Sequence, residues 1–331
     1  MKKLIVLEMA VLSVLLVIAV MLSTKHNKPT LSQNQLSTTT SSNDTTTNTA
    51  DTHQTEAAQN GPTWNTYPED RQITAQQYFV YDYQDRAYLL NSGSADDQVY
   101  PASFTKLFTA HVIMYYLQPD NYCTVGDEID LVAPGSPLAQ LQKGDRLTAR
   151  QLIEGMLLSG GNDAAYVLAC NSGRIITGKP QLDAASAVQA FVQEMNRRAK
   201  TLGMPNTHFV NPDGIHDPDQ YSTIKDLTTL TTLCMSNNTI MRNVIVPEAD
   251  ITLHGETVVW KNTNALIDPE SPYYCPYAIG LNTDQTPEAG NNLLSIFKKD
   301  GRFLIIGVFS SRSHADCFDD ALQLFNQFVL D

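Results

Sequence analysis

The stretch that decides the fold lies in the first half of the chain and reads Val99-Tyr100-Pro101-Ala102-Ser103-Phe104-Thr105-Lys106. It contains an S-x-x-K pattern, and side chains at positions i and i+3 of a helix share one face. The amine of Lys106 can therefore come within hydrogen-bond distance of the Ser103 hydroxyl. A serine hydroxyl becomes a good nucleophile when a neighbouring base takes its proton, and a lysine can be that base if burial lowers its pKa. Ser103 and Lys106 are thus a candidate nucleophile and general base.

The segments around this stretch predict helices packed on an antiparallel sheet. Apolar spacing and N-cap residues predict helices over Ser103–Leu117, Thr148–Leu158, Asn162 to near Gly173, Asp183–Leu202, Ser222–Met235 and His314–Val329. Alternating apolar residues predict strands at Gln77–Tyr83, Ala87–Asn91, Asn292–Lys299 and Arg302–Ser310, the last two flanking the hairpin signal Asp300-Gly301. Strands at both ends of the domain, with helices between them, indicate an α+β fold with one sheet built from both ends.

The N-terminal part of the chain is organised differently from the rest. In residues 1–29, Lys2 and Lys3 precede an apolar run from Leu4 to Leu22, close to the roughly 20 residues that span a bilayer. The run exceeds the roughly 7–15 apolar residues of a signal peptide, so we favour an uncleaved membrane anchor over a cleaved segment and secretion. Residues 30–62 are rich in Ser, Thr, Asn and Gln and are interpreted as a disordered linker. Residues 63–331 form one domain, expected on the extracytoplasmic face of the cell membrane.

Composition excludes several classes of protein. The 331 residues carry 22 Lys and Arg against 35 Asp and Glu, a net charge of −13, which argues against a nucleic-acid partner. The cysteines are widely spaced without a C-x-x-C, so they are interpreted as small buried residues, with a Cys123–Cys170 pair left open. His208 and His216 belong to no H-E-x-x-H pattern, which argues against a zinc hydrolase. No metal or cofactor is expected.

Further motifs along the domain resemble those of the serine D-Ala-D-Ala carboxypeptidases, the low-molecular-mass penicillin-binding proteins. Besides the nucleophile motif, the matching segments are Leu147-Thr148-Ala149-Arg150-Gln151-Leu152, Gly161-Asn162-Asp163-Ala164-Ala165, Phe209-Val210-Asn211-Pro212-Asp213-Gly214-Ile215-His216-Asp217, Tyr221-Ser222-Thr223, Trp260-Lys261-Asn262-Thr263-Asn264 and Thr286-Pro287-Glu288-Ala289-Gly290. They occur in order along nearly all of the domain. The resemblance implies an α+β fold of the penicillin-binding or β-lactamase type.

The resemblance also implies a mechanism. Ser103 would attack the peptide bond between two D-alanines of a peptidoglycan stem peptide and form an acyl-serine intermediate, with Lys106 as general base and backbone N–H groups stabilising the oxyanion. β-Lactams, which mimic the acyl-D-Ala-D-Ala end, would be inhibitors. His216 lies in a loop that runs near the family's cleft, which makes it a candidate binding residue. A loop histidine that holds its own turn is the simpler interpretation.

The chain departs from the family's second motif, S-x-N. When the motif is aligned on Asn162, its serine position is occupied by Gly160, and Ser159 stands one residue earlier. Asn162 and Ser159 are the candidates for this part of the site. We expect Ser159 to relay a proton only if the Gly160-Gly161 turn re-aims its side chain.

The third motif, K-T-G, is altered more strongly. It receives the substrate's terminal carboxylate on an edge strand, and here it reads Asn282-Thr283-Asp284. The lysine charge is lost, and a carboxylate stands where the family has glycine. Both changes disfavour a substrate that ends in a carboxylate, because charge-assisted hydrogen bonds are the stronger ones and like charges repel in a desolvated site. Asn282, Thr283 and Asp284 are the candidate substrate-binding residues, and Arg312 is a candidate replacement cation.

Three interpretations of these departures stay open. The chain is an active serine hydrolase with a compensating cation, an active enzyme for a substrate without the carboxylate, or a catalytically impaired homologue that serves as a non-catalytic cell-wall-binding or regulatory surface protein. The intact Ser103 and Lys106 favour retained chemistry. A class A β-lactamase shares the fold and the S-x-x-K, but we find no E-x-x-x-N arrangement between the second and third motifs.

Overall fold

The computed structural model describes residues 72–328. The predicted anchor, the predicted linker and the first residues of the predicted domain lie outside this range. Within it, none of the helices has the length and apolarity needed to cross a membrane. The described residues belong to one compact unit.

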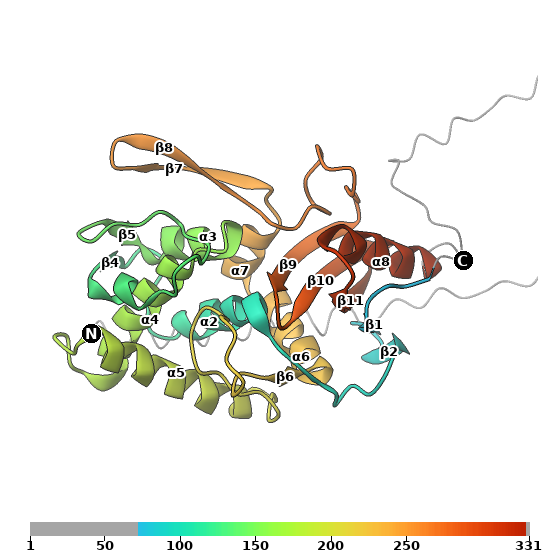
Figure 1. The fold of residues 1–331 in the computed structure, drawn as a ribbon, viewed down its shortest axis with the longest axis horizontal. Helices are drawn as coiled ribbons and strands as arrows, with labels where there is room; N and C mark the ends of the chain where they lie inside the picture. Colours follow the sequence, from blue (N-terminus) through green and yellow to red (C-terminus); the bar gives the residue numbers. More distant parts are fainter. Residues whose placement is uncertain (1–71, 329–331) are drawn as a thin grey trace, which may run out of the picture. The chain divides into compact units, whose positions relative to one another are not determined.

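One five-stranded antiparallel sheet joins the two ends of this unit. Its strands are β1 (Gln77–Asp82), β2 (Ala87–Asn91), β9 (Ala278–Thr286), β10 (Gly290–Lys299) and β11 (Arg302–Ser311). Their order is β2-β1-β11-β10-β9, so the N-terminal hairpin pairs with the C-terminal strands and β9 is an edge (Figure 1). The expected sheet built from both ends is confirmed, and so is the hairpin at Asp300-Gly301, where both residues have positive φ as a tight hairpin turn requires.

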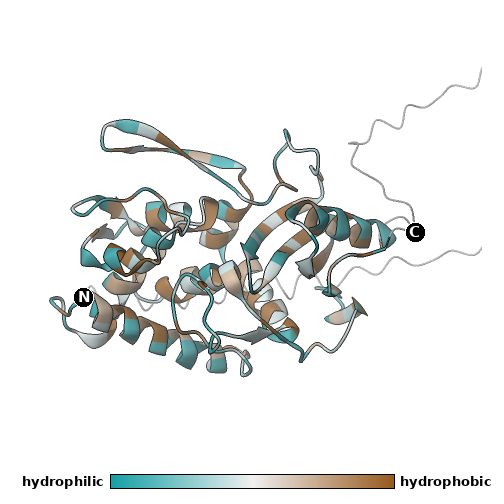
Figure 2. Ribbon diagram, viewed as in Figure 1, coloured by the Kyte–Doolittle hydropathy of each residue, from teal (hydrophilic) through white to brown (hydrophobic). Residues whose placement is uncertain are grey.

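The sheet is buried on both faces. Successive side chains of a strand point to opposite sides, so each strand contributes residues to two cores. On one face Val80, Ile306 and Val308 pack with Phe318 and Phe325 of α8 (His314–Gln327). On the other face side chains such as Phe79, Leu294 and Ile305 join the core of the helical part of the domain. Figure 2 shows that the helices likewise carry both hydrophobic and hydrophilic residues along their length.

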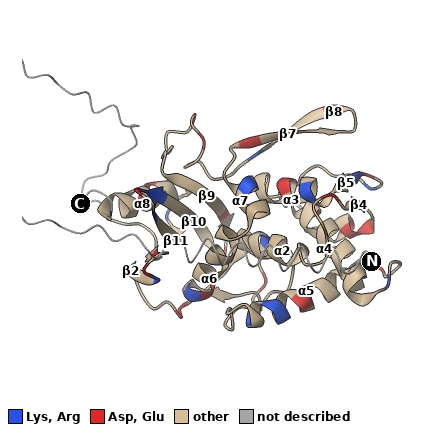
Figure 3. Ribbon diagram, turned by 180° about the vertical axis from the view of Figure 1, so that it is seen from behind, with Lys and Arg blue, Asp and Glu red and all other residues tan. Residues whose placement is uncertain are grey.

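The helical part lies between the two halves of the sheet in the sequence. Its helices are the 3-10 turn η1 (Ala102–Phe104), α2 (Thr105–Ile113), the 3-10 helix η2 (Asp127–Leu131), α3 (Ala149–Leu158), α4 (Asn162–Thr177), α5 (Ala184–Thr201), α6 (Ile224–Met235) and α7 (Asn238–Val244). Two-stranded pairs complete it: β3 (Gln98–Val99) with β6 (Ser222–Thr223), β4 (Tyr122–Thr124) with β5 (Arg146–Thr148), and β7 (Glu248–Leu253) with β8 (Glu256–Lys261). Figure 3 shows basic and acidic positions interspersed along these helices.

Most of the predicted helix starts coincide with an N-cap residue in the structure. Thr148 caps α3 in a complete capping box with Gln151, Asp183 caps α5 by accepting from the N–H of Ser186, and Thr223 caps α6. These caps satisfy backbone N–H groups that have no partner within the first turn.

Two predicted boundaries are wrong. The helix that follows Ser103 ends at Ile113 rather than at Leu117. The predicted end near Gly173 is also wrong, because α4 continues to a left-handed Gly178. A Cβ on Gly173 would lie 1.9 Å from the carbonyl oxygen of Ala187 in α5, so this glycine allows two helices to approach closely instead of ending one.

Candidate active site

Ser103 lies in a short 3-10 turn that leads into α2. The residue before it, Ala102, has a φ of +45°, a conformation that costs energy for a residue with a Cβ and that often marks functional sites. Gly214 (φ +90°) packs against this turn so closely that a Cβ on it would lie 1.9 Å from the carbonyl oxygen of Ala102. Ser103 itself stays partly exposed, while Ala102 and Phe104 on either side are buried. The turn therefore presents one hydroxyl from an otherwise buried segment.

Lys106 contacts this hydroxyl, as the S-x-x-K spacing predicts. Its Nζ donates to Ser103 Oγ at 3.2 Å and to the backbone carbonyl of Asp213 at 2.6 Å. The side chain is 2% exposed, and burial lowers the pKa of its amine, although the buried carboxyls of Asp213 and Asp284 oppose this change. A buried lysine with a lowered pKa can lose its proton and act as a general base.

The edge strand β9 holds the nucleophile turn on both sides of Ser103. Asp284 Oδ1 accepts the backbone N–H of Ser103 at 3.0 Å. Asn282 Nδ2 donates to the Ser103 carbonyl at 3.3 Å. Both side chains are buried, and residues two apart in a strand point to the same face. The two positions that depart from K-T-G therefore contact the nucleophile residue directly, which the alignment alone did not indicate.

Two buried carboxyls lie beside Lys106. Asp284 is 8% and Asp213 is 1% exposed, and each has an Oδ2 without a hydrogen-bond partner among the described residues. Burial raises the pKa of both carboxyls, while the nearby charge of Lys106 acts in the opposite direction. The site therefore contains one basic group between two acids whose charged forms are disfavoured by desolvation. Asp213 was missed as a site residue, although it belongs to a loop that the sequence motifs had singled out.

The residues of the altered second motif lie at the junction of α3 and α4. Ser159 Oγ donates to the carbonyl of Gly155 in α3 at 2.7 Å, so in this structure its hydroxyl is hydrogen-bonded to the preceding helix. Asn162 is buried at the start of α4, with its Oδ1 unpartnered among residues 72–328. The catalytic roles of Ser159 and Asn162 remain predictions.

Thr283 and His216 take different positions relative to the nucleophile. Thr283 pairs with Leu293, which belongs to the core under α8, so the strand alternation places its side chain on the face away from Ser103. The ring of His216 packs edge-on against Tyr100, with 4.7 Å between ring centroids. His216 also lines a small cavity of about 10 Å³ with Ala102 and Gly214, which places it beside the nucleophile turn.

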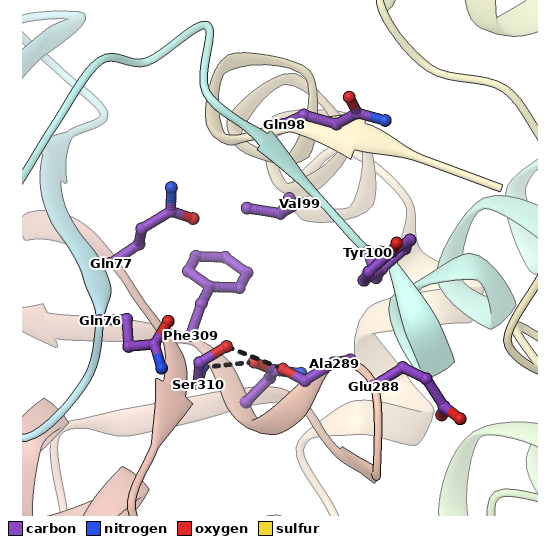
Figure 4. A pocket seen from close by; sticks show the side chains of 10 residues that line it. Gln76, Gln77, Gln98, Val99, Tyr100, Glu288, Ala289, Phe309 and Ser310 are labelled. Carbon is purple, nitrogen blue, oxygen red and sulfur yellow. Dashed lines mark hydrogen bonds between the residues drawn. The ribbon is translucent and has the colours of Figure 1, made fainter. Parts of the chain in front are cut away.

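A larger polar pocket of about 540 Å³ adjoins this small cavity and shares Tyr100 and Ala289 with it. Figure 4 shows its lining, in which Ser310 Oγ donates to the Ala289 carbonyl at 3.0 Å. The remaining lining residues are Gln76, Gln77, Gln98, Val99, Glu288, Asn292 and Phe309. Asn292 is buried and lies opposite Asp284 in the sheet, so the pocket is continuous with the strand that holds Ser103. Most of its polar groups are neutral amides and hydroxyls.

Arg312 and the cysteines lie in positions that answer two further questions from the sequence. Arg312, the candidate replacement cation, is 73% exposed and pairs with Asp316 at the start of α8, over 3.3 Å. All five cysteines are free and buried, so the pair left open between Cys123 and Cys170 is not formed. Burial raises the pKa of each of these two thiols to about 12, which makes them unreactive small core residues.

Comparison with known proteins assigns the family. The model of the D-alanyl-D-alanine carboxypeptidases, Peptidase S11, matches residues 62–313. A D-alanyl-D-alanine carboxypeptidase of Streptomyces sp. strain K15 is 34% identical over 258 residues, 72% of this chain and 84% of the relative. The DacD carboxypeptidase of Escherichia coli K12 is 30% identical over 266 residues, 78% of this chain and 63% of the relative.

Solved structures agree with the sequence relatives. The crystal structure of the Streptomyces K15 DD-transpeptidase superposes with a TM-score of 0.68 at 31% identity, over 77% of this chain and 97% of that chain. Penicillin binding protein 5 of Haemophilus influenzae has the same fold, with a TM-score of 0.66 at 24% identity over 80% of this chain and 72% of that chain. The predicted α+β fold of the penicillin-binding type is confirmed. The chain belongs to the family of D-alanyl-D-alanine carboxypeptidases.

Proposed function

We propose that this chain is a serine D-alanyl-D-alanine carboxypeptidase that acts on peptidoglycan stem peptides. The observation that carries the proposal is the buried amine of Lys106, which lies 3.2 Å from Ser103 Oγ. Lys106 takes the hydroxyl proton while Ser103 Oγ forms a bond to the carbonyl carbon of the penultimate D-alanine. The bond to the terminal D-alanine then breaks, its nitrogen receives a proton, and water hydrolyses the acyl-serine ester.

The comparisons favour this activity over the alternative of a non-catalytic wall-binding or regulatory homologue. The two sequence relatives described above are named as carboxypeptidases, and the solved neighbour at 31% identity is named as a DD-transpeptidase. Both enzyme classes begin with attack of a serine on the same bond, and they differ in whether water or an amine takes the acyl group. The buried Lys106 supports the first step in either case.

The polar pocket beside the nucleophile turn is the proposed place for the part of the stem peptide that precedes the scissile bond. Its amide and hydroxyl groups suit a peptide backbone, and Tyr100, 38% exposed, offers a ring face for packing. Gln98→Ala should then raise the KM for a stem peptide while β-lactam acylation of Ser103 stays unchanged. An unchanged KM would argue against this placement.

The N-terminal segment and the family together support a location at the outer face of the cell membrane. Residues 1–29 combine two lysines with a long apolar run, and a stem peptide is a substrate found outside the membrane. We propose a single N-terminal anchor followed by a linker of residues 30–62. Fractionation of cells that express the full chain, with and without residues 4–22, tests this: the full chain should remain with the membranes, and the shortened chain should not.

The activity is tested with a fluorescent penicillin and with a peptide that ends in D-Ala-D-Ala. The purified protein should acquire a covalent label and release D-alanine, and Ser103→Ala should do neither. β-Lactams should compete with the peptide, since both acylate the same hydroxyl. A folded protein that takes no label at high probe concentration and releases no D-alanine would contradict the proposed activity.

A further inference from the structure

The carboxylate of Asp284 occupies a position that matters in every acyl transfer at Ser103. Attack of Ser103 Oγ on the carbonyl carbon of a ligand forms a tetrahedral intermediate whose oxyanion needs preorganised N–H donors nearby. The backbone N–H of the nucleophilic residue itself is one such donor, because the short side chain keeps the new oxyanion close to it. In this structure that N–H is already bound, since it donates to Asp284 Oδ1 at 3.0 Å.

The surroundings of Asp284 make this contact persistent. The side chain is 8% exposed, on a strand paired along its length with β10. Asn282, two residues earlier on the same strand, donates to the carbonyl of Ser103, so β9 contacts the nucleophile through both an acceptor and a donor. Hydrogen bonds from Ser103 and from the backbone of Gln285 act to lower the pKa of Asp284 against the effect of burial.

We propose that Asp284 controls the rate of acylation by occupying the oxyanion-stabilising N–H of Ser103, so that an incoming carbonyl must displace its carboxylate. The proposal rests on the proposed function, because it concerns the first step of that reaction. The carbonyl oxygen of a substrate or β-lactam and the carboxylate of Asp284 compete for one donor. A ligand that ends in a carboxylate is further disfavoured by the like charge of Asp284.

Three variants distinguish the effect of the occupied hydrogen-bond donor from the effect of the negative charge. Asp284→Ala removes both the acceptor and the charge. Asp284→Asn keeps an amide oxygen that can accept the Ser103 N–H but removes the charge. Asp213→Asn removes the charge of the other buried acid near Lys106, and it leaves the contact between Ser103 and Asp284 in place. Together the three variants distinguish a freed donor from a changed electrostatic environment.

The experiment measures the second-order rate constant for acylation by a fluorescent penicillin, with Ser103→Ala as the blank. Asp284→Ala should acylate at least about tenfold faster than the unmodified chain, since one oxyanion donor is worth a factor of roughly 10²–10³ in rate. Asp284→Asn and Asp213→Asn should each gain less than Asp284→Ala, because both leave an acceptor on the Ser103 N–H.

Three results would overturn the proposal. If the chain labels at Ser103 and Asp284→Ala is no faster, the carboxylate does not obstruct the reaction. If Asp284→Ala and Asp284→Asn gain equally, the charge and not the occupied N–H sets the rate. If no variant acquires Ser103-dependent label although circular dichroism shows each to be folded, the proposed function itself fails, and the proposal with it.

Discussion

The amine of Lys106 lies between the carbonyl oxygen of Asp213, at 2.6 Å, and the hydroxyl of Ser103, at 3.2 Å. The shorter hydrogen bond fixes the amine to the loop that carries Asp213, and Thr109 of the same helix donates to the carbonyl of Pro212 at 2.7 Å. His208 and Tyr221 pair in a β-bridge, and two hydrogen bonds hold the loop between them against α2. This docking aligns the amine with the nucleophile before any substrate binds.

Replacement of Lys106 by methionine tests whether this amine is the base. Acylation by penicillin should fall by about 10²–10⁴, the usual contribution of general-base catalysis. Thermal stability should also fall, because the buried carboxyls of Asp213 and Asp284 lose the nearby positive charge, so circular dichroism must show that the variant is folded. Lys143→Met is the control, since Lys143 is half exposed and pairs with Asp127 and Asp130 away from Ser103. Equal acylation rates in the two variants would exclude Lys106 as the base.

Substitution of Gly214 tests the tight contact between the loop and the nucleophile turn. Gly214→Ala should destabilise the protein by about 2–5 kcal/mol, because a Cβ adds a clash to an unfavourable positive φ, and the displaced Ala102 should slow acylation. Gly255→Ala is a matched control, with a similar φ of +84° and no atom within 4 Å of an added Cβ. It should cost about 1–2 kcal/mol and leave acylation unchanged. Urea unfolding and label kinetics measure both effects, and equal losses would show that packing against Ala102 is unimportant.

Local sequence signals were sufficient for most of the fold. The caps at Thr148, Asp183 and Thr223 and the turn at Asp300-Gly301 act within a few residues, so each can be recognised from its own segment. Gly173 could not be interpreted in this way. Its role depends on the approach of α5 to α4, which is a tertiary contact.

The same distinction between local and tertiary contacts applies to the candidate site. The contact between Ser103 and Lys106 follows from helical spacing and was predicted. The contact between Ser103 and Asp284 joins residues 181 positions apart, so only the folded sheet brings them together. The same limit applies to Asp213, whose carbonyl binds Lys106 across 107 positions. In both cases the residue lay in a segment that the motifs had indicated, but its partner was not predictable.

The two altered positions of the third motif should act together. Asn282→Lys alone should raise acylation little, because the new ammonium lies on the same strand face as Asp284 and pairs with that carboxylate. In an Asp284→Gly background the same lysine is free to attract the carboxylate of a β-lactam or a stem peptide, and acylation should rise beyond the gain of Asp284→Gly. Rate constants of the four proteins form a double-mutant cycle. Additive effects on the logarithm of the rate would show that the two positions are independent.

The raised pKa of Asp284 predicts a specific dependence of stability on pH. Burial is the main cause of the increase, so between the ordinary value of 3.8 and the raised value the folded chain binds a proton that the unfolded chain has released. The free energy of unfolding therefore contains a stabilising contribution that is complete below pH 3.8 and is lost as the pH rises through the raised pKa. Asp284→Asn lacks this titration, so its stability relative to the unmodified chain should increase with pH over that range.

Asp183→Asn provides the opposite case for the same measurement. Asp183 caps α5, and the hydrogen bonds from Ser186 lower the pKa of its carboxyl. Its contribution is present above the ordinary value of 3.8 and is lost as the pH falls through the lowered pKa. Urea unfolding of both variants at several pH values should thus give stability differences, relative to the unmodified chain, that change with pH in opposite directions. Slopes of the same sign would mean that Asp284 ionises more readily in the folded protein than in water, because its contacts at Ser103 stabilise the carboxylate more strongly than burial opposes it.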